Sequence, residues 1–401
     1  MTVVPRVVLY LSPTGEMGGA EYSLLDLVAR LDRRRFEPRV LSLADGPLLA
    51  AARRHGAGAE ALPVSRAFEA TSLRGRRTDL AGLLAGVVAA APVVRAARRA
   101  RRRAGAAIVH SNGNKTHLVS LGVRPGSRAH VVWHVRDFLL DRAPERLLVR
   151  LANRWVSAVV ANSRAVGARL ERLGLQSGRL HVVPNGIDPA VFTPVGPRAA
   201  LREEFGWPAE APLVGIVGVL ARWKGQHVFL AAARQIAARR PDVRFVVVGA
   251  EIYRTRGHGE YEAELRERVD RWGLREIVRL TGYRTAVPDV LRALDVVVHA
   301  SVEPEPFGRV IIEGLACGRP VVCTQGGGAD EIVGDSPLQA LQVPRGDASA
   351  LARAVEGLLA SPAERCRLGG LGRARVQERY GVDAHVARIG ALYDALLAES
   401  G

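Results

Sequence analysis

Two glutamates eight residues apart carry the strongest chemical signal in this sequence of 401 residues. Glu305 stands directly before Pro306, Phe307 and Gly308, and Glu313 follows inside an apolar run that predicts a helix. A helix that starts after a glycine presents bare backbone amides, which suit a phosphate. Carboxylates on either side can grip hydroxyl groups. The pattern indicates a site for a ligand that carries both phosphate and hydroxyls, although an ordinary solvated glutamate on an amphipathic helix is the alternative.

A lysine in a chain that otherwise uses arginine is the second signal. Lys224 is one of two lysines among 57 basic residues, and it lies between the predicted strand Leu213–Val219 and Gly225. A compact ammonium suits a phosphate as a point charge, where arginine brings a wide fork. Arg222 stands two residues earlier and is expected to reach the same phosphates.

A glycine pair follows the first predicted strand. Gly18 and Gly19 precede an amphipathic segment that runs to Leu31. Such a pair at a helix start can present amides to a phosphate, although many strand-to-helix turns carry glycine for steric reasons alone.

Polar residues also follow two further predicted strands. His134 and Asp137 come at the end of the strand 130–134, and Asn112 and Lys115 come after the strand Ile108–Ser111. Site residues collect at the carboxyl ends of strands in doubly wound folds. We therefore expect these four residues to be candidates for the site, although a single histidine is more often structural.

The elements that must position these residues alternate between strand and helix along the whole chain. Alternation of this kind predicts parallel, doubly wound sheets. Two such series predict an α/β chain of two Rossmann-like domains that face a central cleft. The predicted strands are Val7–Ser12, Arg39–Leu43, Ile108–Ser111, His130–His134, Val159–Asn162, His181–Val183, Leu213–Val219, Arg244–Val248, Val278–Thr281, Asp295–Ala300, Pro320–Thr324 and Leu338–Val343.

A proline-rich connector marks the domain boundary. Six prolines lie between Pro184 and Pro212, and proline both fixes backbone angles and removes a hydrogen-bond donor. We expect one domain over residues 1–188, a second over 189–380, and a C-terminal helix within 381–401.

The segment around the two glutamates resembles the retaining glycosyltransferases of family 4, which have the GT-B fold. In that family the first glutamate contacts the transferred sugar and the second contacts the ribose, and Glu305 and Glu313 hold these positions here. The resemblance implies donor contacts for Phe307, Gly308 and Arg309 as well. It rests on the Pro-Phe-Gly after Glu305 and on Gly327, Gly328, Glu331 and Ile332 further along.

Other motifs extend the resemblance and one departs from it. Lys224-Gly225 matches the family's diphosphate lysine, but the family arginine that follows the strand glycine is Val219 here, so Arg222 is the expected substitute. The resemblance implies that Gly18 and Gly19 close over the donor, that His134 lies near the transferred sugar, and that the base is contacted near Tyr283 and Arg284. It also implies that the helix Ala384–Glu399 crosses back to the first domain. On the same resemblance, residues 1–188 form the acceptor-side domain, with Asp137, Asn112 and Lys115 on the acceptor side, and residues 189–380 form the nucleotide-sugar domain.

Composition excludes several protein classes. Apolar residues make up 48% and charged residues 24%, which is typical of globular proteins. The three cysteines have no disulfide or metal spacing, and they suit a reducing compartment. The start of the chain reads as a strand, not a signal peptide, and no apolar run is long enough to span a membrane. We expect a cytoplasmic protein with no metal and no cofactor.

The positive charge is concentrated in the first half. Residues 1–188 hold 30 basic and 14 acidic residues, a net of +16 out of the total of +17. An anionic membrane surface that carries a lipid-linked acceptor is one explanation, with contact through the basic region 74–103 on the inner face of the membrane. A soluble acidic acceptor and a merely solvated surface are the others. Few aromatic residues and no nucleic-acid motif argue against nucleic acid.

These observations predict a metal-independent hexosyltransferase that keeps the anomeric configuration. Its donor would be a UDP- or GDP-sugar and its acceptor a hydroxyl of a sugar or of a lipid-linked or cell-envelope glycan, as in polysaccharide biosynthesis. Two alternatives stay open: a non-catalytic basic GT-B module that binds membrane or polyanion, and a nucleotide-sugar epimerase of the same fold.

Overall fold

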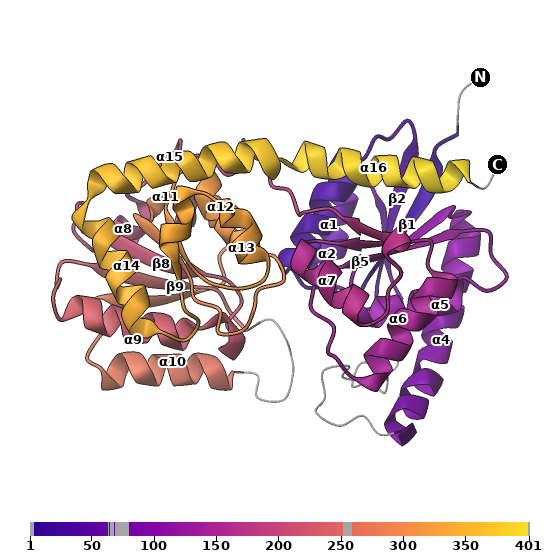
Figure 1. Ribbon diagram of the computed structural model, residues 1–401, viewed down its shortest axis with the longest axis horizontal. Helices are drawn as coiled ribbons and strands as arrows, with labels where there is room; N and C mark the ends of the chain where they lie inside the picture. Colours follow the sequence, from indigo (N-terminus) through magenta and orange to yellow (C-terminus); the bar gives the residue numbers. More distant parts are fainter. Residues whose placement is uncertain (1–3, 63, 65–67, 69–79, 252–258, 400–401) are drawn as a thin grey trace. The chain divides into compact units, whose positions relative to one another are not determined.

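The computed structural model describes residues 4–62, 64, 68, 80–251 and 259–399. The chain divides into two compact units, and each contains its own parallel sheet covered by helices (Figure 1). Unit 1 consists of Met1–Gly186 with Val382–Gly401, and unit 2 of Ile187–Gly381.

Unit 1 is built on a sheet of seven parallel strands in the order β3-β2-β1-β4-β5-β6-β7. The crossover between β3 and β4 puts the strands of the two halves on either side of β1. The strands are β1 (Arg6–Ser12), β2 (Phe36–Ser42), β3 (Gly58–Ala61), β4 (Ile108–Ser111), β5 (His130–Val135), β6 (Ala158–Ala161) and β7 (Leu180–Val182).

Helices cover both faces of this sheet, and their apolar sides form two separate cores. One face carries α1 (Gly19–Arg30), α2 (Pro47–Arg54) and the C-terminal α16 (Val382–Ala398), which packs beside α1. The other face carries α4 (Leu80–Ala104), α5 (Asn114–Val123), α6 (Ala143–Trp155) and α7 (Arg164–Arg172). The last residues of the chain therefore complete the first unit.

Unit 2 has a sheet of six parallel strands in the order β10-β9-β8-β11-β12-β13 around a single apolar core. The strands are β8 (Leu213–Val217), β9 (Arg244–Val248), β10 (Val278–Gly282), β11 (Val296–His299), β12 (Val321–Thr324) and β13 (Gln342–Val343). The helices are α8 (Ala200–Glu204), α9 (Gln226–Ala237), α10 (Glu260–Arg271), α11 (Val287–Ala293), α12 (Arg309–Ala316), α13 (Gly328–Val333), α14 (Ala348–Ala360) and α15 (Pro362–Arg379), with short 3₁₀ turns at Arg222–Lys224 and Pro337–Leu341.

The structure differs from the sequence prediction at two edge strands. β3 was not predicted, and the predicted strand Leu338–Val343 is mostly the 3₁₀ turn Pro337–Leu341, with only the two residues of β13 extended. Of the basic region 74–103, residues 74–79 lie outside the described part of the chain, and the rest belongs to α4. Within the described residues, no helix combines the length and the apolar character that crossing a membrane requires.

Candidate active site

An ion pair between Lys224 and Glu305 forms the centre of the candidate site in unit 2. The Lys224 ammonium donates to both carboxylate oxygens of Glu305, at 3.0 Å to Oε1 and 2.8 Å to Oε2. The Glu305 side chain is 11% exposed and that of Lys224 is 28% exposed. The structure therefore joins the two residues that the sequence singled out separately, and it leaves the lysine partly open to solvent.

The end of β11 completes the surroundings of Glu305. His299 is the last residue of β11, and its Nε2 lies 3.1 Å from Glu305 Oε2. The Ser301 hydroxyl donates to the same oxygen at 2.9 Å, and the Thr324 hydroxyl donates to the carbonyl of Ser301. Since both carboxylate oxygens are occupied, the side chain of Glu305 has a fixed orientation.

These contacts determine the charge of Glu305. Burial alone would raise its pKa, but the Lys224 ammonium and the hydrogen bond from His299 outweigh burial and hold the pKa well below its usual range. Glu305 is therefore an anion throughout the physiological pH range. It can accept hydrogen bonds from hydroxyl groups, and it cannot act as a general acid there.

Two glycines allow the chain segments of this site to approach one another. Gly225 ends the turn of Lys224 with φ of +72°, and a Cβ built on it would lie 1.9 Å from the carbonyl oxygen of Ala300. A Cβ on Gly327 would lie 2.1 Å from the carbonyl oxygen of Glu305. Only glycine fits either position, because both the backbone angle and the space exclude a side chain.

The N-terminus of α12 lies directly beside Glu305. Gly308 caps this helix with φ of +96° and makes no side-chain cap, and a Cβ built on it would lie 3.5 Å from Glu305 Cγ. The first amides of α12 and its dipole favour an anion here. Glu313 accepts a hydrogen bond from Arg309 Nε at 2.6 Å, one turn apart on the same helix, whereas the Phe307 side chain packs in the core against Tyr380.

Arg222 shares the turn of Lys224 but has different partners. Its guanidinium forms an ion pair with Glu264 on α10 and lies over the Tyr261 ring, 5.2 Å from the centroid. Its side chain is 64% exposed. Arg222 is therefore part of the same turn as Lys224, but its guanidinium is directed to Glu264.

The residues predicted to lie near the base follow β10. Gly282 ends this strand with φ of +70°, Tyr283 is exposed, and Arg284 forms an ion pair with Glu204 at the end of α8.

In unit 1, Gly18 and Gly19 form the start of α1. Gly18 is the N-cap and makes no side-chain cap, and a Cβ on Gly19 would meet no atom within 4 Å. Sterics therefore do not require glycine at position 19. Glu21 in the first turn is buried, and this burial raises its pKa to about 7, against opposing hydrogen bonds from the backbone.

His134 is fully buried and belongs to a chain of polar side chains. Its Nδ1 lies 3.1 Å from Arg136 and 3.2 Å from His110 Nε2, while His110 Nδ1 lies 2.7 Å from the Tyr393 hydroxyl of α16. Since arginine can only donate, His134 Nδ1 must accept, and His110 must carry its proton on Nε2. Burial and then Arg136 lower the pKa of both histidines well below the usual range, so both are neutral.

Arg136 also binds Asn112, which was predicted as a site residue at the end of β4. It donates from Nε to Asn112 at 2.7 Å, and from Nη1 to Ser23 at 2.8 Å and Asn185 at 2.5 Å. Asn112 in turn donates to the carbonyl of Ala20 in α1. The structure thus brings Asn112 and His134 together through an arginine that the sequence analysis did not select.

Asp137 and Lys115 make contacts of their own. Asp137 accepts from the backbone amide of Phe138 at 2.9 Å, and the Lys115 ammonium lies 6.0 Å from the centre of the Phe68 ring. Four functional candidates were missed: Arg136, Glu21, His299 and Ser301. Arg136 and His299 had the same signal as His134, a polar residue at the carboxyl end of a strand.

Two family descriptions match this chain, and together they cover most of it. Residues 17–191 match "Glycosyltransferase Family 4", and residues 197–375 match "Glycosyl transferases group 1".

Among the similar proteins is the lipopolysaccharide core biosynthesis mannosyltransferase LpsB of Rhizobium meliloti, 29% identical over 70% of this chain and 84% of the relative. The D-inositol 3-phosphate glycosyltransferase of Xylanimonas cellulosilytica is 35% identical over 59% of this chain, and the match spans only 56% of that relative. The crystal structure of Anabaena Alr3699/HepE in complex with UDP and glucose has a TM-score of 0.81 and 28% identity, and covers 96% of this chain and 99% of that one. With two parallel-sheet units and these matches, the chain belongs to glycosyltransferase family 4 and is a glycosyltransferase of the GT-B fold.

Proposed function

We propose that the protein transfers a hexose-type sugar from a UDP- or GDP-sugar to an acceptor hydroxyl, with retention of the anomeric configuration. The observation that carries this proposal is the buried Lys224–Glu305 pair beside the open N-terminus of α12. One site then offers an ammonium and helix amides for a diphosphate and a fixed anion for sugar hydroxyls. The UDP and glucose named for the Anabaena structure support a nucleotide-sugar donor.

Each side chain has a role in this proposal. Lys224 and the first amides of α12 stabilise the negative charge that grows on the leaving diphosphate. Glu305 accepts hydrogen bonds from the transferred sugar, and Glu313 accepts them from the ribose. Arg222 is the proposed substitute for the family arginine, and on this view it leaves Glu264 when the donor binds.

The proposed reaction needs neither a metal nor a cofactor. The bond between the anomeric carbon and the diphosphate oxygen breaks, and its electron pair stays with the diphosphate. The acceptor hydroxyl forms the new bond from the same face of the sugar. The leaving diphosphate takes the proton of that hydroxyl.

The acceptor is proposed to bind to unit 1. Its net positive charge and the Arg136 cluster at the ends of β4 and β5 support an anionic or phosphate-bearing acceptor, such as a lipid-linked glycan. His134 remains a proposed contact of the transferred sugar, since its Nε2 has no hydrogen-bond partner within the described residues. Contacts of Gly18, Gly19, Phe307, Tyr283 and Arg284 with the donor, and of Asp137, Asn112 and Lys115 with the acceptor, also remain predictions.

Donor turnover tests the proposal. A thermal-shift panel of UDP, GDP and their sugars identifies the donor, because a ligand at a hundredfold excess over its Kd stabilises by about 2.7 kcal/mol. With that donor, Glu305→Gln and Lys224→Met should each lower kcat by at least about a hundredfold. The NMR coupling of the product's anomeric proton reports the configuration.

Three results would contradict the proposal. Turnover that survives both substitutions in folded protein would remove the site assignment. A donor that is converted to its epimer without acceptor would identify an epimerase. A panel in which no nucleotide sugar shifts the melting temperature would favour a non-catalytic module.

A further inference from the structure

Helix α6 carries two rows of side chains that are unusual for a solvent-facing helix. Arginine recurs at every fourth residue, and leucine recurs at the same spacing one position further on. Residues four apart lie on the same side of a helix, so each row forms a continuous stripe and the two stripes are adjacent. The arginines are Arg142, Arg146, Arg150 and Arg154, and the leucines are Leu147 and Leu151.

The leucine row faces outward. Leu147 is 49% exposed and Leu151 is 40% exposed, which places both among the most exposed large apolar residues of the described chain. The opposite side of α6 is anchored in the core of unit 1 by Val149 and Ala152, which are fully buried. The exposed leucines are therefore not needed to hold α6 in place.

The arginine row supplies cations beside these leucines. Arg146 is engaged by Asp141 at 2.6 Å. Arg150 and Arg154 are exposed, and no carboxylate lies within ion-pair distance of either one in the described residues. The Arg154 guanidinium lies over the Trp155 ring, 5.5 Å from its centroid, so the C-terminal half of the helix combines cations that no carboxylate neutralises in the described residues with exposed apolar surface.

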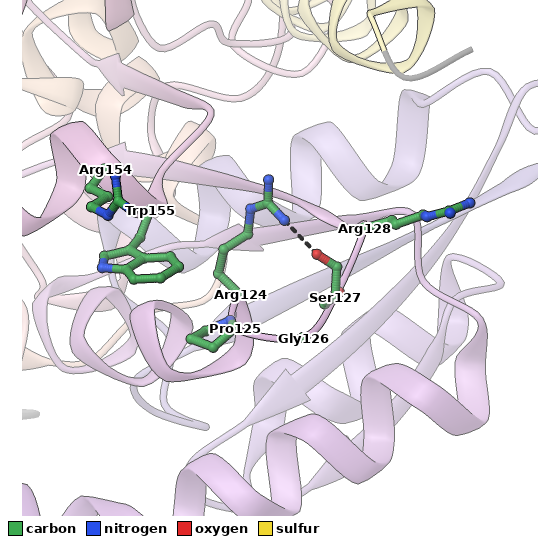
Figure 2. A pocket seen from close by; sticks show the side chains of 7 residues that line it. All are labelled: Arg124, Pro125, Gly126, Ser127, Arg128, Arg154 and Trp155. Carbon is green, nitrogen blue, oxygen red and sulfur yellow. Dashed lines mark hydrogen bonds between the residues drawn. The ribbon is translucent and has the colours of Figure 1, made fainter.

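A basic hollow of about 470 Å³ lies at the C-terminal end of this row (Figure 2). Arg154 and Trp155 line one side, and Arg124 and Arg128 of the connection before β5 line the rest. In Figure 2, Arg124 bonds the carbonyl of Ser127 and Arg128 extends away from Arg154, so the cations border an open depression and do not converge on one point. The hollow lies at the N-terminal end of β5, whereas His134 and Arg136 lie at the C-terminal end of that strand.

We propose that the outward face of α6 and the adjoining basic hollow dock on a membrane surface that contains anionic phospholipids. An interfacial helix presents leucine and tryptophan to the acyl boundary and arginine to the phosphates, which is the arrangement of Leu147, Leu151, Trp155, Arg150 and Arg154. Tryptophan favours the level of the headgroups. The net charge of +16 on residues 1–188 is complementary to an anionic leaflet.

The apolar row decides against a soluble polyanion as the partner. Binding to nucleic acid rests on cations and on aromatic stacking, and exposed leucines add nothing to it. The surface also replaces region 74–103 as the place of membrane contact. This inference rests on the proposed function in one respect, since it would bring a lipid-linked acceptor to unit 1.

Vesicle sedimentation with the full chain tests the inference. The probes are vesicles of phosphatidylcholine alone and of phosphatidylcholine with an equal amount of phosphatidylglycerol. Wild type should bind only the anionic vesicles. An arginine near such a surface contributes about 1 kcal/mol, so Arg150→Gln with Arg154→Gln should weaken partitioning roughly thirty-fold. Leu147→Ser with Leu151→Ser should weaken it by about tenfold, and this loss should persist in high salt, which screens only the charges.

Matched controls separate this surface from the others. Arg99→Gln with Arg102→Gln removes two exposed cations from α4 and should leave partitioning within about twofold. Glu305→Gln should bind vesicles like wild type while it loses donor turnover, so failure of the proposed function and failure of the docking surface are distinguishable.

Four outcomes would overturn the inference. Wild type that ignores anionic vesicles excludes membrane docking. Equal binding of the α6 variants and wild type, or loss only in the α4 variant, assigns docking elsewhere. Tighter binding to a DNA duplex than to vesicles, with the leucine variant unaffected, identifies a polyanion site. Intact circular dichroism of each variant ensures that a loss is not a loss of folding.

Discussion

Replacing Lys224 with methionine isolates the energetics of the central ion pair. Methionine keeps the length of the side chain but leaves the Glu305 carboxylate, only 11% exposed, without its cation. Removal of one partner from a buried pair costs about 3–5 kcal/mol. Because 28% of the Lys224 side chain remains in water, we expect the lower end, a loss of about 3 kcal/mol in the free energy of unfolding at pH 7.

The pH dependence of that loss has a definite sign. In the wild type the pKa of Glu305 lies below its value in the unfolded chain, so the stability it contributes is fully present above pH ~4.3 and is lost only as the pH falls from there through the depressed folded-state pKa. In Lys224→Met burial dominates and raises the pKa of Glu305 above its ordinary value. The stability of the variant then falls as the pH rises through that raised pKa. As the pH falls from 7 toward ~4.3, the penalty in the variant disappears and the difference between the two proteins should shrink, but it should reach zero only near the depressed pKa of the wild type.

A chain of two units need not unfold in one step, so the measurement must report on unit 2 alone. Hydrogen exchange of the β8 and β11 amides in increasing urea gives the free energy of unfolding of that unit. The double variant Lys224→Met/Glu305→Gln should recover most of the loss, since no buried charge remains. Arg240→Met is the control: it removes one partner of an exposed ion pair with Asp242, so the free energy of unfolding should change little. A single variant as stable as wild type at pH 7, or a difference that stays constant down to pH ~4, would refute the reasoning.

Two further predictions concern backbone space and buried histidines. Gly225→Ala should destabilise unit 2 by more than about 2 kcal/mol, because of its positive φ and the clash with the Ala300 carbonyl. Gly357→Ala lies at an open position of α14 and should stabilise unit 2 by up to about 1 kcal/mol. Urea unfolding checks both variants, and equal effects would contradict the steric argument. Below pH ~6.5, His110 and His134 become protonated in the unfolded chain but stay neutral in the folded protein. The free energy of unfolding of unit 1 should therefore fall by up to about 1.4 kcal/mol per pH unit for each histidine. Hydrogen exchange of β4 and β5 between pH 7 and pH 5 measures this loss, and protection that does not change would show that the histidines can be charged in place.

The sequence was sufficient for the strands whose residues favour extended backbone. Ile108–Ser111 and Arg244–Val248 were predicted with their observed bounds, because short β-branched runs between helices leave little ambiguity. β3 has the sequence GAEA, which has no β preference, and it is extended because it pairs with β2 at the edge of the sheet. Residues 338–341 look like a strand, but the Ser336 hydroxyl accepts from the Leu338 amide and caps a 3₁₀ turn there.

The sequence was less informative about the contacts within the site. Lys224 and Glu305 could each be selected from local signals, but their direct ion pair joins residues 81 positions apart and has no local signature. The burial of His134 has the same origin. Its partner His110 is held by Tyr393, which is 283 residues further along the chain and is brought there by α16. Such long-range contacts depend on packing, which a single sequence does not display.

The way the chain passes between its units has a consequence for its synthesis. It leaves unit 1 after Gly186 and returns at Val382, and at this point Ile187 pairs with Gly381 and its amide donates to the Tyr380 carbonyl at 2.9 Å. Unit 2 is therefore a continuous insertion that can fold on the ribosome as soon as it emerges. Unit 1 lacks α16, and with it the Tyr393 hydroxyl, until the residues of α16 have been synthesised. A nascent chain stalled before α16 would carry a finished unit 2 and an incomplete unit 1, so unit 1 of such partial products should be open to proteolysis.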